Sequence, residues 1–467
     1  MDLGRAISEV RASIDLHVRE RQVNRILHGF PSPRCWRPGA LSVPDVMRQR
    51  ANSNVRSPAS FSLYVGVPYC IRTDPDRCGY CLFPVEVFEG AKQFDTYLDY
   101  LAREGDLHRE FFQGTTPDRV YIGGGTPNLM RPQQYTQMMA LIHEMFPGLT
   151  PRHPITLEGI PQLFTKEKLA HMKAGGINRI SMGVQQLNPE LNQLSGRKQT
   201  ARHVFDAIAW CRELGLQCNA DLIFGWPQQT LDTMMNDLEQ LVATGVDHIA
   251  HYELNVGGSS DFSLNRRHEL PSVELTREMY RVGRDYLTAN GYRQLTAYDF
   301  QKIEDEPAFV YEECERDAEH HDVWGWGFSG VSDFGGTAEN PGWTYVNHRR
   351  ARDYFAALDR GDFPVERGFV RQSVDLRLHT LYRNLQGMEV NRKRYFHRFG
   401  MDVYDEHAPV WQALLEIGWC SCTEETIRLL GDGVYYVPLI QMLLSRHRMD
   451  QIRASMTPSA MTMLTAS

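Results

Sequence analysis

Residues 62–81 read SLYVGVPYCIRTDPDRCGYC. The first six residues predict an apolar β-strand, and three cysteines follow at Cys70, Cys78 and Cys81. Thiolates are ligands of iron–sulfur clusters and of zinc, but structural zinc normally takes four ligands. Three thiolates leave one iron of a 4Fe–4S cluster open to bind and activate another molecule. The stretch therefore predicts a 4Fe–4S site, with a zinc site and three incidental loop cysteines as the alternatives.

The other six cysteines predict no disulfide framework. The total is nine, an odd number, and the chain is long, whereas disulfide frameworks are typical of short secreted domains. Cys211 and Cys218 are expected in a helix and in the strand after it, too far along the chain to pair simply.

Strand-like and helical runs alternate downstream of the quoted stretch. Such alternation predicts parallel strands joined by crossover helices. Six units predict an α/β fold, either a doubly wound sheet or a partial barrel, with function at the carboxyl ends of the strands. The six strand candidates are SLYVGV, RVYIGGG, ITLEGI, INRISMGV, LQCNADLIFG and HIAHYELNV.

We predict five regions along the 467 residues. The regions are an N-terminal helical arm and linker (1–60), the partial barrel (61–300), a glycine- and aromatic-rich loop and connecting region that closes the barrel (301–362), a small α+β accessory domain of winged-helix-like character (363–447), and a flexible tail (448–467). The accessory domain should hold two short strands around a Gly-Asp-Gly turn at 431–433.

Composition narrows the class of partner. The net charge is −8, with acidic and basic residues interspersed, which argues against binding to a nucleic-acid backbone. No apolar run approaches the roughly 20 residues that span a bilayer. The charged N-terminal stretch lacks the apolar core of a signal peptide. We therefore expect a cytoplasmic protein that binds neither nucleic acid nor membrane.

The stretch from Tyr64 to Cys81 resembles the start of the radical S-adenosylmethionine (SAM) superfamily barrel. It is most similar to the family of oxygen-independent coproporphyrinogen III oxidase and its relatives, the HemN-like enzymes. The resemblance continues in order through GGGTP at 123–127, Glu158, NRISMGVQ at 178–185, Arg197 and DLIFGWPQ at 221–228. It implies a partial (β/α)6 barrel with the cluster at its mouth and SAM bound to the open iron.

The resemblance also implies roles for single residues. Tyr64 would contact the cofactor, Glu158 would accept hydrogen bonds from ribose hydroxyls, and Arg197 would offer its planar fork to the SAM carboxylate. Glycines would let a ligand approach the backbone. A core aromatic, a solvated strand end, a surface arginine and a tight turn are the respective structural alternatives. The SAM-binding candidates are Tyr64, Tyr80, Gly124, Gly125, Thr126, Glu158, Gln185, Arg197, Asp221, Ile223, Asn255 and Val331.

A second SAM is expected beside the first, lined by Tyr80, Ile223, Asn255 and Val331. Residues 324–332 match the family's G-x-G-x-x-S segment within a region that predicts a long functional loop. Its Trp324 and Trp326 are expected either to stack on a planar substrate or to anchor a turn against the accessory domain.

Three positions depart from the coproporphyrinogen oxidases. Phe83 stands in place of a further cysteine, Gly66 in place of a histidine, and seven residues rather than three separate Cys70 from Cys78. The inserted Arg72, Asp74, Asp76 and Arg77 are candidates for shaping substrate access.

These departures favour relatives that use two SAM molecules. We expect reductive cleavage of SAM to a 5′-deoxyadenosyl radical, then methylation or cyclopropane-forming methylene transfer to an sp2 carbon of a small planar or unsaturated molecule. An electron donor such as flavodoxin or ferredoxin is implied. A porphyrin- or haem-directed oxidoreductase is the alternative, and a haem-binding chaperone is a third. Axial-ligand candidates for the chaperone are His251, Cys314, His320 and His321.

Overall fold

The computed structural model describes residues 2–22, 28–52, 61–303, 322–337 and 339–456. The central strands of its main sheet are the six that the sequence predicts, and neighbouring strands among them are parallel. The predicted α/β fold with a parallel sheet is therefore confirmed. These strands are β1 (Phe61–Val67), β4 (Arg119–Gly124), β5 (Ile155–Gly159), β6 (Arg179–Gln185), β7 (Gln217–Phe224) and β8 (His248–Glu253).

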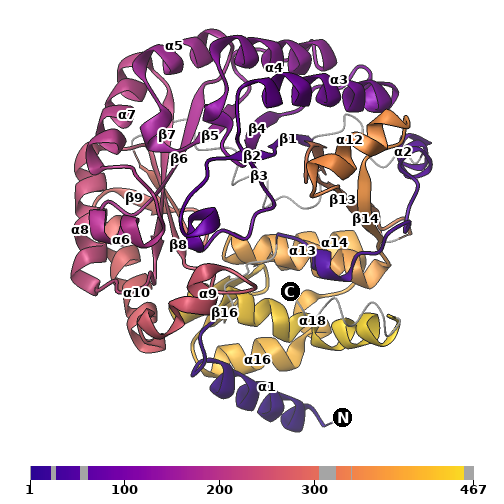
Figure 1. Ribbon diagram of the computed structural model, residues 1–467. Helices are drawn as coiled ribbons and strands as arrows, with labels where there is room; N and C mark the ends of the chain where they lie inside the picture. Colours follow the sequence, from indigo (N-terminus) through magenta and orange to yellow (C-terminus); the bar gives the residue numbers. More distant parts are fainter. Residues whose placement is uncertain (1, 23–27, 53–60, 304–321, 338, 457–467) are drawn as a thin grey trace.

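Helices form an arc around the outer face of this sheet (Figure 1). Alternate residues of β1, Leu63, Val65 and Val67, are almost completely buried, because successive side chains of a strand point to opposite faces. The covering helices are α3 (Lys92–Phe112), α4 (Pro132–Met145), α5 (Lys166–Ala174), α7 (Ala201–Leu214), α8 (Leu231–Thr244) and α10 (Val273–Ala289). Short helices α6 (Pro189–Leu194) and α9 (Asp261–Asn265) lie in the connections.

The sheet extends beyond both ends of the parallel core, in the order β14-β13-β12-β11-β1-β4-β5-β6-β7-β8-β10-β9. β11 is parallel to β1, and β10 is antiparallel to β8. α12 (Ala351–Asp359) follows β13. The added strands are β9 (Tyr292–Gln294), β10 (Asp299–Lys302), β11 (Asp322–Gly327), β12 (Val331–Phe334), β13 (Trp343–Asn347) and β14 (Val365–Val370).

The prediction of a long loop around residues 322–334 is therefore wrong. A Cβ on Gly325 would lie 2.4 Å from the backbone nitrogen of Val331, so this glycine allows two strands to approach rather than a loop to close on a ligand. Trp324 and Trp326 stack on each other with ring centroids 5.3 Å apart, and Trp324 also stacks on Phe112 of α3. Both tryptophans pack under α3, so neither predicted role applies to them.

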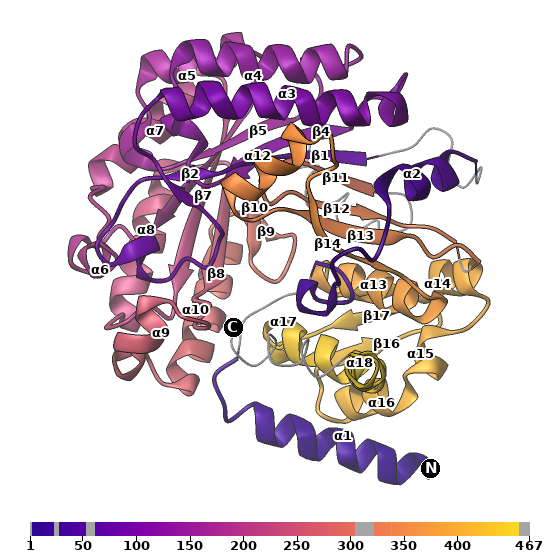
Figure 2. The ribbon, with the colours of Figure 1, turned by 45° about the vertical axis from the view of Figure 1, so that its right-hand side comes forward.

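The C-terminal part combines helices with a three-stranded sheet in the order β15-β17-β16. Its helices are α13 (Ser373–Gln386), α14 (Arg392–Phe399), α15 (Val403–Glu406), α16 (Ala408–Glu416), α17 (Asp432–Tyr435) and α18 (Val437–Ala454), and its strands are β15 (Glu389–Asn391), β16 (Cys420–Cys422) and β17 (Thr426–Leu429). The N-terminal helix α1 (Leu3–His17) lies along α16 (Figure 2), and α2 (Val43–Asn52) follows it in the chain.

Several local predictions need correction here. The turn between β16 and β17 lies at 423–425, whereas Gly431 and Gly433 flank the start of α17. A Cβ on Gly433 would lie 2.1 Å from the carbonyl oxygen of Trp419, so close packing explains that glycine. β14 lies beyond the boundary predicted at residue 363 yet pairs with β13, and α18 continues to Ala454 into the predicted tail.

The thiols of Cys211 on α7 and Cys218 on β7 are hydrogen-bonded, and this contact together with burial raises the pKa of Cys218. The two thiols meet because the crossover brings the helix back onto its strand. Both are free thiols. Within the described ranges, no helix has the length and apolar character needed to cross a bilayer.

Candidate active site

The cysteine loop begins where β1 ends and is held in one conformation by its own hydrogen bonds. The chain passes through β2 (Tyr69–Cys70), which pairs with β3 (Glu86–Val87). The Thr73 hydroxyl accepts a hydrogen bond from the backbone N–H of Cys78 at 2.8 Å and donates one to the Pro75 carbonyl at 2.8 Å. Cys78 has φ 57°, a region that residues other than glycine rarely adopt. Thr73 therefore stabilises the backbone that presents Cys78.

The three thiols influence one another electrostatically. Burial and the neighbouring cysteines together raise the pKa of Cys70 and raise that of Cys81 to about 11. The Sγ of Cys70 lies 3.1 Å from the hydroxyl of Thr126. A bound cationic iron centre would reverse this preference for the thiol form, because it stabilises thiolate.

The donor set fits a cluster. Among the residues that the structure describes, no group of three or more His, Cys, Asp or Glu is placed to hold one metal ion. A 4Fe–4S cluster makes a different demand, because each thiolate binds a different iron. Three mutually interacting thiols on one stabilised loop meet that demand.

Arg197 lies beside these thiols. Its Nε and Nη2 donate to the Oε1 of Gln199 at 3.0 and 2.7 Å, and Nη2 also donates to the carbonyl of Gly183. Burial alone lowers the pKa of Arg197, but its interactions with Tyr80, Cys78 and Cys70 outweigh burial, and the pKa is raised overall. Arg197 is therefore a fixed positive charge beside the cysteines rather than a surface arginine.

The seven-residue segment between Cys70 and Cys78 packs directly against the segment that carries this arginine. A Cβ on Gly196, which has φ 70°, would lie 2.3 Å from the carbonyl oxygen of Asp74. A longer loop adds little closure entropy, and here its backbone contacts the residue before Arg197. The seven-residue segment thus becomes part of the wall of the site.

Two carboxylates lie on neighbouring parts of the same sheet. Glu158 accepts hydrogen bonds from the Tyr121 hydroxyl at 2.8 Å and from the N–H of Gly124 at 3.0 Å. Tyr121 stacks on Tyr64, with ring centroids 6.0 Å apart. Burial raises the pKa of Glu158. Burial and then the charge of Glu158 raise the pKa of Asp221 to about 7. Carboxylate oxygens accept more than one hydrogen bond, so Glu158 retains capacity for a ligand.

Backbone hydrogen bonds hold the glycine loop, which follows β4, against the start of the cysteine loop. The N–H of Gly125 donates to the Val67 carbonyl at 2.8 Å, and the N–H of Thr126 donates to the Tyr69 carbonyl at 2.7 Å. A Cβ on Gly125 would lie 2.3 Å from that Tyr69 oxygen. Backbone packing therefore already requires this glycine, and the loop places Thr126 against Cys70.

The four residues predicted to line a second SAM are divided between two parts of the sheet. Tyr80 and Ile223 share a small apolar cluster with Trp226 and others, and the Tyr80 and Trp226 rings lie 4.9 Å apart. Asn255 follows β8, and its buried Oδ1 has no hydrogen-bond partner among the described residues. Val331 instead begins β12, on the β1 side of the sheet. Gln185 ends β6 with φ 66°.

Sequence reasoning missed Thr73, Tyr121 and Gln199. Tyr121 had a usable signal, because it lies two residues before Gly123 and therefore on the same face of β4. Thr73 and Gln199 had none, since their hydrogen-bond partners depend on loop conformations.

The departure at position 66 has a structural explanation. A Cβ on Gly66 would lie 2.2 Å from the carbonyl oxygen of Phe328, so no larger side chain fits without a backbone shift. The hydroxyl of Tyr97 bridges this contact, donating to the Gly66 carbonyl and accepting from the Phe328 N–H. Phe83 is 53% exposed and lies on the surface.

The predicted haem ligands receive no support from the described structure. His251 is buried against Phe224 at a ring distance of 4.7 Å, and burial lowers its pKa to about 3. Cys314, His320 and His321 lie outside the described residues.

Residues 74–241 match the model of the Radical SAM superfamily. The haem chaperone HemW of Escherichia coli K12 is 28% identical over 242 residues, which cover 52% of this chain and 62% of HemW. The oxygen-independent coproporphyrinogen III oxidase of the same strain is 27% identical over 319 residues, covering 66% of this chain and 67% of the oxidase. The solved coproporphyrinogen III oxidase HemN of Escherichia coli, a radical SAM enzyme, aligns with a TM-score of 0.77 and 22% identity, covering 90% of this chain and 96% of HemN.

These matches show that the chain carries a radical SAM domain. Its relatives and its fold are similar to those of the HemN-like radical SAM proteins, as the motifs predict. This superfamily uses a 4Fe–4S cluster and SAM. The matched region spans less than two thirds of the length of HemW from Escherichia coli. The predicted methyl or methylene transfer finds no support in these relatives, which are named as haem chaperones and coproporphyrinogen oxidases.

Proposed function

We propose that this protein binds a 4Fe–4S cluster on Cys70, Cys78 and Cys81, cleaves SAM and acts on a porphyrin or haem. One observation carries the first part of this proposal. A loop with three interacting thiols is packed against a fixed arginine, and two partly buried carboxylates lie on parallel strands of the same sheet. No simple structural role requires so many ionisable groups to be buried together.

Each residue of the site has its own role in binding SAM. When bound and reduced, the cluster supplies the one electron that cleaves the sulfonium of SAM. Arg197, held by Gln199, presents a positive charge to the carboxylate of SAM. Glu158, oriented by Tyr121 and Gly124, accepts hydrogen bonds from ribose hydroxyls. Asp221, whose pKa is raised to about 7, can donate or accept a hydrogen bond near neutral pH.

A tetrapyrrole is the substrate class that the relatives favour. Both curated relatives are named for haem or coproporphyrinogen. In the sequence, Gly66 and Phe83 favour a substrate other than a porphyrin. The contact of Gly66 with Phe328, however, requires a glycine at position 66 for packing alone. The loss of that histidine therefore carries little information about the substrate. The proposal also includes a second SAM, bound at Tyr80, Ile223 and Asn255. It further includes a cytoplasmic location.

Anaerobic reconstitution tests the central claim. The wild-type chain should bind about four irons, absorb near ~400 nm and convert SAM to 5′-deoxyadenosine when reduced. Cys70→Ala should lose the cluster. The matched control is Cys420→Ala, because Cys420 is a buried thiol in the accessory sheet. Cluster formation in Cys70→Ala, or a chain that takes up zinc alone, contradicts the proposal.

A haem chaperone is the second candidate, and the similarity to HemW favours it. Turnover of coproporphyrinogen III distinguishes the oxidase from the chaperone. An oxidase should release carbon dioxide from coproporphyrinogen III in step with 5′-deoxyadenosine. A chaperone should bind haem stoichiometrically, as followed by its absorbance, and should leave coproporphyrinogen unchanged.

A further inference from the structure

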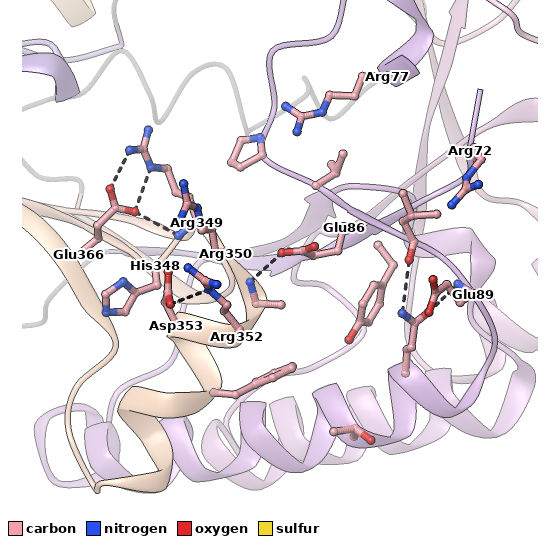
Figure 3. A pocket seen from close by; sticks show the side chains of 18 of the residues that line it. Arg72, Arg77, Glu86, Glu89, His348, Arg349, Arg350, Arg352, Asp353 and Glu366 are labelled. Carbon is pink, nitrogen blue, oxygen red and sulfur yellow. Dashed lines mark hydrogen bonds and ion pairs between the residues drawn. The ribbon is translucent and has the colours of Figure 1, made fainter. Parts of the chain in front are cut away.

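A cavity of about 1360 Å³ lies beside the cysteine loop (Figure 3). Tyr69, Arg72, Leu82 and the β3 strand form one side of it. The residues leading into α12 form the opposite side, and α3 contributes Gln93 and Thr96. None of the SAM-binding candidates lines this cavity, so it is distinct from the site described above.

The cavity carries more positive charge than its own acidic residues neutralise. Arg349 pairs with Glu366 at 2.7 Å, and Arg352 pairs with Asp353 at 3.2 Å. The lining arginines are Arg72, Arg77, Arg349, Arg350 and Arg352, and the lining acids are Glu86, Glu89, Asp353 and Glu366.

Two arginines remain available to a partner. Arg72 and Arg350 are exposed, and neither side chain makes a hydrogen bond or ion pair with any residue in the described ranges. Glu86 is already engaged, because it accepts a hydrogen bond from the N–H of Ala351 at 2.9 Å. The unneutralised charge of this surface is therefore positive on a chain whose net charge is −8.

Apolar side chains accompany this charge. Leu82 is 37% exposed, Phe83 53% and Val87 37%. An apolar centre with a charged rim is typical of protein–protein interfaces. Leu82 and Val87 line the cavity itself, and Leu82 directly follows Cys81 in the chain. The surface is thus one residue from a predicted cluster ligand.

We propose that this surface is the docking site of an acidic protein that donates one electron to the cluster. The inference rests on the proposed function, because reductive cleavage of SAM consumes one electron. In the step, the donor protein is oxidised by one electron and the cluster is reduced by one, with no bond formed or broken. A protein fits better than a small anion, since small-molecule pockets usually measure about 300–1,000 Å³ and this cavity is larger, with exposed apolar side chains beside it.

Charge reversal at Arg350 tests the proposal. Arg350 is the N-cap residue of α12, where a glutamate is well tolerated, and it lies on a different segment from the cysteines. The reconstituted holoprotein is mixed with reduced flavodoxin, an acidic one-electron donor, and bleaching of the cluster is followed by anaerobic stopped flow. The same variant is then reduced with photoreduced deazaflavin, a small reductant that needs no docking surface.

Arg350→Glu, and more so Arg72→Glu/Arg350→Glu, should slow reduction by flavodoxin about 10- to 100-fold at low salt, because opposite charges steer association. Salt at about 0.5 M should remove most of the difference between variant and wild type. Reduction by deazaflavin should be unchanged. Arg202→Glu is the matched control, since Arg202 is an exposed arginine on α7 far from the cavity in sequence.

Equal rates of reduction by flavodoxin in wild type and double variant overturn the inference. Equal slowing with both reductants also overturns it, because the arginines would then act on the cluster itself. Failure of the proposed function is a separate result. In that case the wild-type chain binds no cluster, or forms no 5′-deoxyadenosine even with deazaflavin.

Discussion

Glu104 gives a sharp test of the packing that joins α3 to the strands added beside β1. Its side chain is completely buried. Oε2 accepts hydrogen bonds from the Tyr354 hydroxyl at 2.6 Å and the Gly327 N–H at 2.8 Å, and Oε1 accepts one from Asn347 Nδ2 at 2.7 Å. Burial raises the pKa of Glu104 from 4.5 to about 7, although these three donors lower it in part.

The direction of the pH effect follows from this raised pKa. The folded protein holds the proton more tightly than the unfolded chain, so folding is most favoured below pH 4.5. The stabilisation is lost as the pH rises through about 7. Each pKa unit corresponds to about 1.4 kcal/mol, so the full effect is about 3 kcal/mol. Between about pH 5 and about pH 8, about 2 to 3 kcal/mol of this should appear.

Glu104→Gln removes the titration while keeping the shape of the side chain. The free energy of unfolding of wild type and variant is measured by chemical denaturation at several pH values, and the difference between the two is plotted against pH. Wild type should lose about 2 to 3 kcal/mol relative to the variant between about pH 5 and about pH 8. Other carboxylates with raised pKa values, such as Asp221, titrate in both proteins and cancel in the difference.

The matched control is Glu110→Gln, an exposed glutamate on the same helix. Its difference from wild type should be flat across the same pH range. Parallel stability curves for wild type and Glu104→Gln would show that the buried carboxylate is not destabilised, and the reasoning would be refuted.

Three further outcomes are expected. Thr73→Val removes both hydrogen bonds of the Thr73 hydroxyl and should destabilise the cysteine loop by about 1 to 3 kcal/mol; lower iron content after reconstitution checks it, and normal loading in Thr73→Val, equal to Thr73→Ser, would contradict it. Arg197→Ala should weaken SAM binding about 10- to 100-fold with the iron content unchanged, as measured by equilibrium dialysis against Arg202→Ala; unaltered affinity would remove Arg197 from the SAM site. Gly66→Ala should lower the free energy of unfolding by about 1 to 3 kcal/mol because of the contact with Phe328, whereas Gly90→Ala, with open space around the new Cβ, should not; equal stability of the two variants would rule out the steric account of Gly66.

The C-terminal part and β11 show why some local predictions failed. The sequence around Gly431 resembles a hairpin turn, but the turn lies at 423–425. Turn residues and helix-start residues overlap in type, so glycine alone does not distinguish them. The same ambiguity applies to Trp324 and Gly325, where large and small residues alternate along β11, a strand paired on both sides.

The sequence by itself determined the parallel core and the identity of the cysteine loop. Apolar strands alternating with helices have few compatible topologies, and residues near the ends of those strands, such as Glu158 and Asp221, necessarily lie along one edge of the sheet. The order of the motifs then indicated the HemN-like family.

Only the tertiary structure decided which groups touch. Three features depend on segments that are distant in the chain or on the conformation of a loop. They are the contact of Gly66 with Phe328, the positioning of Arg197 by Gln199, and the cavity between Arg72 and Arg350. The physical reason is that hydrophobic periodicity specifies which face of an element is buried, whereas side-chain pairing depends on how separate elements pack together.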